Sequence, residues 1–153
     1  MKKMMAAAAL CLLAGGAQAR DLPPGGLTMA EFAYWLKAVG APAQIQTGND
    51  GKQSLVSAAN GQDFHVYFFD CKQDRCGTIQ FSAGFDTKGR FSAAKINDWN
   101  RDNRWARAYV DKANNPWLEY DVDLTPGGSV ELLKDELDIW TGALWNFRKF
   151  GGL

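Results

Sequence analysis

The sequence has little histidine, little cysteine and no excess of charge of either sign. His65 is its single histidine, and its 17 Lys and Arg side chains are balanced by 17 Asp and Glu side chains. A balanced chain has no general attraction for nucleic acid or an anionic membrane, which a basic excess would give. One histidine also leaves too few ligands for an ordinary zinc site. We therefore expect no metal, no cofactor and no nucleic-acid partner.

The chain also lacks an apolar run of the roughly 20 residues that span a bilayer. Its longest run, Met4–Ala14, follows the basic Lys2-Lys3 and precedes the small-x-small sequence Ala17-Gln18-Ala19. Those parts, in that order, are typical of a secretory signal peptide, and the alternatives are a buried helix or a retained anchor. We predict that residues 1–19 are removed by cleavage after Ala19. The mature chain would then be periplasmic or secreted, with no membrane contact.

Removal of the signal peptide takes Cys11 with it and leaves Cys71 and Cys76. An even number of cysteines in an oxidising compartment is typical of a disulfide. Four intervening residues do not match the CxxC spacing of a redox pair. We therefore predict a structural disulfide between Cys71 and Cys76, with a metal site or a redox pair as the alternatives. The bond closes a short loop, so its entropic contribution to stability is about 2 kcal/mol.

Three segments have the caps and apolar spacing of helices. Thr28 and Glu31 form a capping box for the first, Ser92 is a plausible cap for the second, and Ser129 caps the third. Residues 20–27 contain a Pro-Pro-Gly-Gly run and are expected to be a flexible lead-in. The apolar residues that recur at helical spacing are Phe32, Trp35, Leu36 and Val39, then Ile96 and Trp99, then Val130, Leu133, Leu137, Trp140, Leu144 and Phe147.

Six further segments are predicted strands. Asn60-Gly61 is a hairpin signal, and residues 70–77 are expected to form a turn closed by the disulfide. The strand at 63–69 is apolar on both of its faces, so we expect both faces to be at least partly covered. Alternation of period two is clearest in the last strand. The predicted strands are residues 43–47, 53–59, 63–69, 78–85, 105–110 and 118–124.

The elements follow one another as α-β-β-β-β-α-β-β-α, and the turns between strands imply antiparallel pairing. We therefore predict an α+β fold of two layers, with an antiparallel sheet of five to six strands covered by three helices. No internal linker or repeat divides the chain.

The stretch from Ile96 to Gly128 resembles the YbjN family, a group of bacterial proteins named as candidate sensory transduction regulators. The likeness extends over residues 28–150 and implies a single YbjN-like domain. The family resembles type III secretion chaperones in fold, which implies a curved antiparallel sheet, partner binding and no catalytic residues. The motifs that carry the resemblance are Ile96–Asn100, Asn103-Arg104, Ala106–Asp111, Leu118–Leu124 and Gly127-Gly128.

Neither the histidine nor the row of acidic residues in the last strand suggests a catalytic or metal site. Nothing holds a nucleophile beside His65, so we interpret it as a histidine of the sheet. Glu119, Asp121 and Asp123 are spaced by nearly ~7 Å along a strand, which is too far apart to converge on one hard cation. We expect a solvated face, with Arg107 pairing across the strands with Glu119 or Asp121.

Arginine and tryptophan alternate around residue 104. Arg101, Arg104 and Arg107 near Trp99 and Trp105 could stack nucleic-acid bases. We instead expect these arginines to hold a helix–strand corner together by bidentate hydrogen bonds.

One row of side chains remains as a candidate partner surface. Trp105, Arg107, Tyr109 and Trp117 share the outward side of the last two strands, and exposed aromatics beside an arginine are typical of binding surfaces. The alternative is that a helix covers them. We predict an exported, non-enzymatic domain that binds a protein or peptide partner in a regulatory or chaperone-like role, with a homodimer as one form. The alternative function is a small-ligand or envelope-stress sensor with an apolar pocket between sheet and helices.

Overall fold

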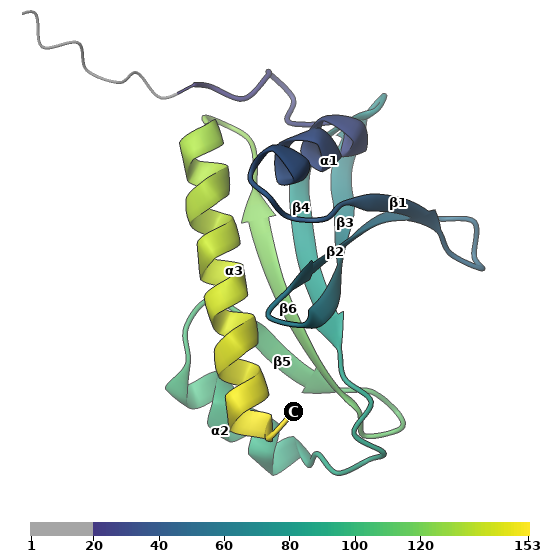
Figure 1. The fold of residues 1–153 in the computed structure, drawn as a ribbon, viewed down its shortest axis with the longest axis vertical. Helices are drawn as coiled ribbons and strands as arrows, with labels where there is room; N and C mark the ends of the chain where they lie inside the picture. The colour runs from purple at the N-terminus through teal and green to yellow at the C-terminus, as the bar shows by residue number, and fades with distance from the viewer. Residues whose placement is uncertain (1–19) are drawn as a thin grey trace, which may run out of the picture.

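The computed structural model describes residues 20–153, so the predicted signal peptide lies outside the described residues. Three helices and six strands follow in the predicted order (Figure 1). All strand pairs are antiparallel, and the sheet order β1-β2-β3-β4-β6-β5 places β6 between β4 and β5. The α+β prediction is confirmed. The elements are α1 (Met29–Ala38), β1 (Gln44–Thr47), β2 (Gln53–Ala59), β3 (Gln62–Lys72), β4 (Arg75–Gly84), α2 (Ala93–Asp102), β5 (Arg107–Val110), β6 (Pro116–Asp123) and α3 (Val130–Gly151).

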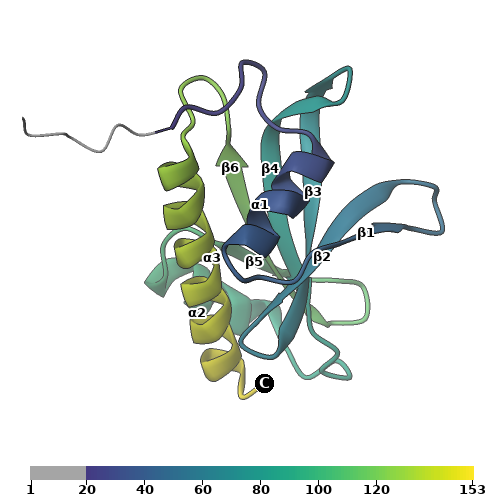
Figure 2. The same cartoon turned by 45° about the horizontal axis from the view of Figure 1, so that its top comes forward.

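Helices α1 and α3 pack against the same side of the sheet, which we call the inner face (Figures 1 and 2). Trp140 of α3 stacks on Phe81 of β4 at 5.5 Å between ring centroids and meets Phe64 of β3 edge-on at 5.6 Å. Phe32 of α1 approaches Phe81 at 6.3 Å. Burial of each such side chain contributes about 1.5–3 kcal/mol, so this aromatic cluster is a main source of stability.

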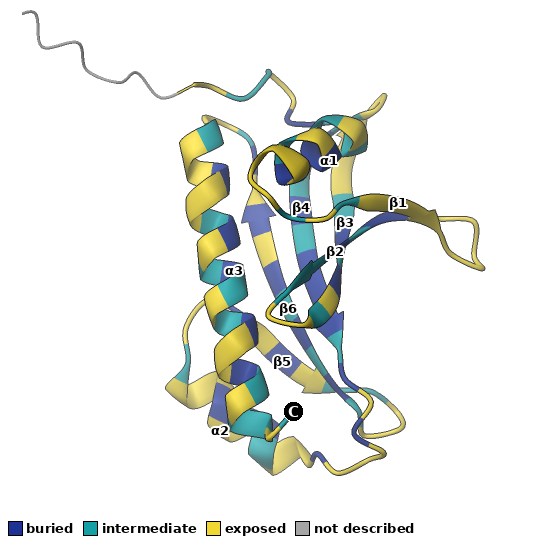
Figure 3. Ribbon diagram, viewed as in Figure 1, coloured by how far each residue is buried: buried dark blue, intermediate teal, exposed yellow. Residues whose placement is uncertain are grey.

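The predicted alternation in β6 is confirmed, because Leu118, Tyr120, Val122 and the following Leu124 are all buried. The apolar stripe of α3 is likewise turned towards the sheet (Figure 3). In α1 the prediction fails at one end: Val39 is the C-cap residue and is exposed, because the chain leaves the helix there and turns through Gly40 at φ +87°. Within residues 20–153, no helix is both long enough and apolar enough to cross a membrane.

The β3–β4 hairpin is longer than predicted. The two strands continue to Lys72 and from Arg75, so Cys71 and Cys76 are directly opposed partners in the ladder. Their disulfide is present in the structure. The prediction of a turn over residues 70–77 was wrong, because main-chain pairing needs no apolar side chains and the polar hairpin tip extends beyond the core.

The segment before α1, expected as a flexible lead-in, is hydrogen-bonded to the domain at both of its ends. The Leu22 amide donates to the Gly128 carbonyl at 2.8 Å, and Leu27 and Cys76 exchange two main-chain hydrogen bonds of 3.2 and 3.0 Å. Composition predicts only local turns, whereas these partners come from distant strands and loops. The segment therefore ties α1 and the start of α3 to the hairpin tip.

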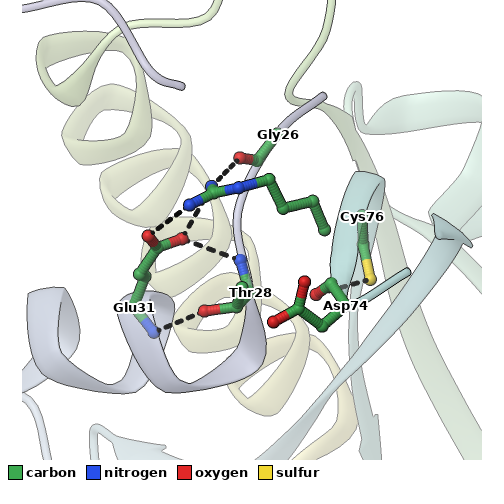
Figure 4. Close-up of polar contacts among 6 residues, drawn as sticks. Gly26, Thr28, Glu31, Asp74 and Cys76 are labelled. Carbon is green, nitrogen blue, oxygen red and sulfur yellow. Dashed lines mark hydrogen bonds and ion pairs between the residues drawn. The ribbon is translucent and has the colours of Figure 1, made fainter. Parts of the chain in front are cut away.

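An ion pair reinforces this attachment at the start of α1. Thr28 and Glu31 form the predicted capping box, with hydrogen bonds of 3.1 and 3.0 Å (Figure 4). Arg75 donates to both carboxylate oxygens of Glu31, at 2.7 and 2.9 Å, and to the Gly26 carbonyl. The hydrogen bonds from Arg75, and then that from the Thr28 amide, lower the pKa of Glu31. The sequence did not predict this contact between α1 and β4, because Glu31 and Arg75 lie 44 residues apart in the chain.

Strand β5 begins at Arg107, two residues later than predicted. Trp105 has φ +75°, so the chain bends there instead of extending. The side-chain amide of Asn100 in α2 donates to the Ala108 carbonyl at 3.0 Å and accepts from the Ala108 amide at 2.9 Å. Helix α2 is thereby fixed beside β5 and the end of α3 (Figure 2).

Candidate functional site on the outer sheet face

The side of the sheet opposite α1 and α3 is called the outer face. Among the described residues, its aromatic rings pair with each other and not with rings of the helices: His65 stacks on Tyr67, and Tyr109 stacks on Trp117. The outer face comprises Asp63, His65, Tyr67 and Phe69 of β3, Thr78, Gln80, Ser82 and Gly84 of β4, Arg107 and Tyr109 of β5, and Trp117, Glu119, Asp121 and Asp123 of β6.

The expectation that both faces of β3 are at least partly covered is confirmed on this side for His65 and Tyr67 and fails for Phe69. Phe69 is 46% exposed, and Tyr67 and His65 are only partly buried. Helices α1 and α3 direct their apolar stripes at the inner face, and α2 packs on α3 through Trp99 and Phe147. An apolar row in the sequence therefore does not by itself say that a helix lies over it.

Three of the four predicted surface residues come together on the outer face. Tyr109 and Trp117 are directly opposed partners, with their rings 6.4 Å apart and 9° from parallel. Arg107 is opposed to Glu119 in the same ladder. Paired rings on two hydrogen-bonded strands form a stiff surface, because each ring restricts the rotamers of the other.

Trp105 does not join them. Its φ of +75° turns the chain away from the strand, and its side chain is 59% exposed. The Arg104 guanidinium lies 4.6 Å from the centroid of its ring. Trp105 lines a separate groove of about 440 Å³ between α2 and α3, beside Gly142 and Ala143. The predicted row of four is thus divided between two surfaces.

Glu119 is the centre of a small polar cluster. Arg107 donates to one of its carboxylate oxygens through Nε and Nη2, at 3.1 and 2.7 Å, and the Tyr109 hydroxyl donates to the other at 2.9 Å. The predicted pairing of Arg107 with Glu119 is confirmed. The Glu119 side chain is 12% exposed and that of Arg107 is 63% exposed. Burial, and then the hydrogen bond to Glu119, raises the pKa of Tyr109 to about 12.

A hollow lies beside Trp117. A Cβ atom on Gly84 would lie 2.8 Å from the Trp117 ring, so the indole rests directly on the glycine backbone. Next to it is a cavity of about 360 Å³, which we call the Trp117 pocket. Its wall carries Asp63 and His65 from the outer face and Asp111 from the β5–β6 turn, together with Gln62, Phe85, Asp86 and Asn115.

The Trp117 pocket is a feature that the sequence reasoning missed. The available signal was Gly84 itself, because a glycine near the end of a strand often marks the close approach of another group. Asp111 accepts hydrogen bonds from the Ala113 and Asn115 amides at 2.8 Å, and the Trp117 Nε1 lies 3.5 Å from its carboxylate. These contacts, with that from Asn115 the largest, lower the pKa of Asp111, so this wall of the pocket carries a stable negative charge.

The residues considered for catalysis or metal binding make side-chain contacts between neighbouring strands of the sheet. His65 Nδ1 lies 3.0 Å from the Ser54 hydroxyl on the neighbouring strand. Asp121 accepts a hydrogen bond from Gln80 at 2.7 Å, and Asp123 accepts one from Thr78 at 3.3 Å. Within residues 20–153, no three His, Cys, Asp or Glu side chains are grouped so as to hold a metal ion.

The arginines do not hold the helix–strand corner as expected. Arg101 forms bidentate hydrogen bonds with its neighbour Asp102 and a third with Asp98 on the same helix. Arg107 pairs within the sheet. The corner is instead connected by Asn100, whose amide can both donate to and accept from one strand residue, which a guanidinium cannot do.

Comparison with known proteins identifies a family and a fold. The model of the YbjN family, described as "Putative bacterial sensory transduction regulator", matches residues 28–149. A solved structure, titled "Crystal structure of YbjN, a putative transcription regulator from E. coli", superimposes with a TM-score of 0.51 at 16% sequence identity. The match covers 76% of this chain and 88% of that chain. A search of curated proteins gave no significant match.

Proposed function

The chain belongs to the YbjN family, and from that premise we propose that it is an exported regulatory domain that acts by binding a protein partner and not by catalysis. The observation that carries this proposal is the outer face, where Arg107, Tyr109 and Trp117 lie together on a sheet surface that no helix of residues 20–153 covers. The family description, a regulator of sensory transduction, supports the regulatory part of this proposal.

The arrangement of these side chains favours binding. Tyr, Trp and Arg are the residue types that dominate the binding energy of protein interfaces. Here Tyr109 is stacked on Trp117, and Arg107 is held by Glu119. Side chains that are already ordered lose little rotamer entropy on association, a loss that otherwise costs about 0.5–1.5 kcal/mol for each flexible side chain.

Export is supported by the disulfide between Cys71 and Cys76. Such bonds persist in oxidising compartments and are rare in the bacterial cytosol. The test is the intact mass of the protein recovered from a periplasmic extract. We expect the mass of residues 20–153 with one disulfide, and recovery of the uncleaved chain from the cytosol would contradict export.

The binding surface is tested by photo-crosslinking in intact cells, with a benzophenone amino acid placed at one position at a time. Probes at Tyr109 and Trp117 should give a discrete crosslinked product. The matched control is Tyr34 of α1, which is 77% exposed on a helix of the inner face. Equal crosslinking at Tyr34, or no product at any of the three positions, would refute the outer face as the partner surface.

A second function, small-ligand or stress sensing, is favoured by a different cavity. A space of about 460 Å³ lies between α1 and the sheet, lined by Met29, Ala30, Ile45 and Phe68 beside the Cys71–Cys76 disulfide. A ligand that binds only the folded protein raises its melting temperature. A thermal-shift screen of small apolar compounds should then find stabilisers of the wild type that fail with Ile45→Glu. Stabilisers that act equally on both proteins would exclude this cavity.

A further inference from the structure

We propose that the partner presents an extended basic segment, with a lysine or arginine side chain in the Trp117 pocket. This inference rests on the partner-binding function proposed above and specifies the chemistry of the partner. It follows from the distribution of charge on the outer face, the composition of the pocket wall and the spacing of the side chains along β6.

Charge on the outer face is strongly one-sided although the whole chain is balanced. The alternating outward positions of β3 to β6 carry four carboxylates and one guanidinium, and the end of β3 adds Asp70, which accepts a hydrogen bond from Thr78, and Lys72, which lines a hollow with Asp123. The guanidinium, Arg107, is already paired with Glu119. Asp63, Asp121 and Asp123 remain as exposed negative charges. A surface of one sign steers oppositely charged partners towards it and rejects those of its own sign.

The wall of the Trp117 pocket has the same character. It includes the carboxylates of Asp63, Asp86 and Asp111 and has no lysine or arginine among the described residues. The indole of Trp117 forms the remaining side, and because it rests on Gly84 and stacks on Tyr109, it offers the pocket an apolar ring edge. A flexible lysine or arginine side chain combines a positive end with an apolar stem that can lie along the ring. Carboxylates together with an aromatic wall therefore match a cationic side chain.

The spacing along β6 sets the conformation of the partner. Trp117, Asp121 and Asp123 lie on one side of the strand, at even-numbered steps from one another. Residues two apart on a strand are separated by about 7 Å. A partner segment that is itself extended presents alternate side chains at the same interval. One cation would then enter the Trp117 pocket, and others further along the segment would meet Asp121 and Asp123.

Two other occupants fit the charge less well. A second copy of the chain, related by a two-fold axis on the outer face, would place carboxylates against carboxylates. A nucleic acid would bring phosphates to the same negative surface. Both are distinguishable in the experiment below.

The probe is a fluorescein-labelled peptide, Lys-Thr-Lys-Thr-Lys-Thr-Lys, titrated with the mature chain while fluorescence anisotropy is followed. A peptide of the same composition with its four lysines in one block, and a third with glutamate in place of lysine, test spacing and charge. We expect the alternating peptide to bind more tightly than the block, the glutamate peptide not to bind, and the affinity to fall as salt is added.

Matched variants locate the binding. The double variant Asp121→Asn/Asp123→Asn removes two exposed charges from the outer face and should weaken binding about tenfold, from two surface ion pairs at up to about 1 kcal/mol each. Trp117→Phe keeps a smaller ring in place and should weaken binding about threefold. The control Asp135→Asn/Asp138→Asn makes the same change in net charge on α3 and should leave the affinity within twofold.

Equal binding of the alternating and block peptides, or an equal loss in the α3 control, would overturn the inference. So would self-association that Asp121→Asn/Asp123→Asn strengthens, or binding of a single-stranded oligonucleotide at the same site. Crosslinking from Tyr109 separates this failure from that of the proposed function. A product that forms undiminished in Asp121→Asn/Asp123→Asn cells would keep partner binding and exclude a basic segment, whereas absence of any product in the wild type would remove both.

Discussion

Two tryptophans on opposite faces of the same sheet have different surroundings. On the inner face Trp140 is fully buried between Phe64 and Phe81, at centroid distances of 5.5–5.6 Å. On the outer face Trp117 rests on Gly84 and stacks on Tyr109, and one side of it borders an open pocket. The Trp140 ring is part of a closed core. The Trp117 ring is held in one orientation by its neighbours but is only partly buried. Residue type alone therefore does not distinguish a core tryptophan from a binding one.

The comparison of the two faces predicts that Trp140→Ala causes the largest loss of stability. Removing a large aromatic side chain from a closed core costs about 3–5 kcal/mol, because the surroundings cannot collapse into the cavity. Urea unfolding followed by circular dichroism measures this loss. Trp145→Ala, on the exposed side of the same helix, should change the free energy of unfolding by less than about 0.5 kcal/mol. Similar losses for both variants would contradict the description of the inner face.

Gly84→Ala should have the next largest effect. The added methyl group would lie 2.8–2.9 Å from three atoms of the Trp117 ring, so the indole must leave its place. Such overpacking costs about 1–3 kcal/mol. The near-ultraviolet circular dichroism of Trp117 should change with it. Gly142→Ala is the control, because a methyl group there meets nothing within 4 Å and alanine favours a helix by about 1 kcal/mol; a loss of stability in that variant would be unexpected.

Trp117→Ala should reduce the stability less than Trp140→Ala or Gly84→Ala. The variant loses the stacking on Tyr109, which is about 0.5–1.5 kcal/mol, and little buried area, because the ring is only partly buried. Comparison of its urea midpoint with that of Trp140→Ala is a direct measure of how differently the two faces are packed. A cost equal to that of Trp140→Ala would make Trp117 a core residue and would weaken the case for a binding surface.

The smallest effect concerns the ionisation of Tyr109. Its pKa is raised from 10.0 to about 12, first by burial and then by the hydrogen bond to Glu119. As pH rises above 10.0, the unfolded chain ionises before the folded one, so the contribution of Tyr109 to stability is complete below that pH and is lost as pH approaches about 12. Burial also raises the pKa of Tyr67 and of Tyr120, so ultraviolet titration should find more than one late tyrosine, and Glu119→Gln should shift the part of the curve that belongs to Tyr109 to lower pH. No change in that variant would exclude the Glu119 contact.

Much of the fold follows from local patterns in the sequence. The capping box of Thr28 and Glu31, the Asn60-Gly61 turn and the alternation from Leu118 to Leu124 each concern neighbours within a few residues. Such patterns fix which side of a strand is apolar. They do not say which strand becomes its neighbour, so the insertion of β6 between β4 and β5 required the structure.

The candidate site was only partly predictable for the same reason. The pairing of Arg107 with Glu119 and the common face of Tyr109 and Trp117 follow from alternation and a hairpin register. The departure of Trp105 depends on one backbone dihedral angle, which favours glycine and has no signal in the sequence of a tryptophan. The Trp117 pocket depends on the register between Gly84 and Trp117, which lie in strands separated by a helix.

The contact between Asn100 and Ala108 gives the two edges of the sheet different properties. At β5 the amide side chain occupies both main-chain groups of Ala108, so another strand cannot pair there without displacing it. At the other edge, β1 is four residues long and has only β2 beside it among the described strands. Strand-by-strand polymerisation requires two open edges on each molecule. With one edge capped, association through the sheet stops when two β1 edges have met, so this route ends at a pair and cannot lead to a fibre.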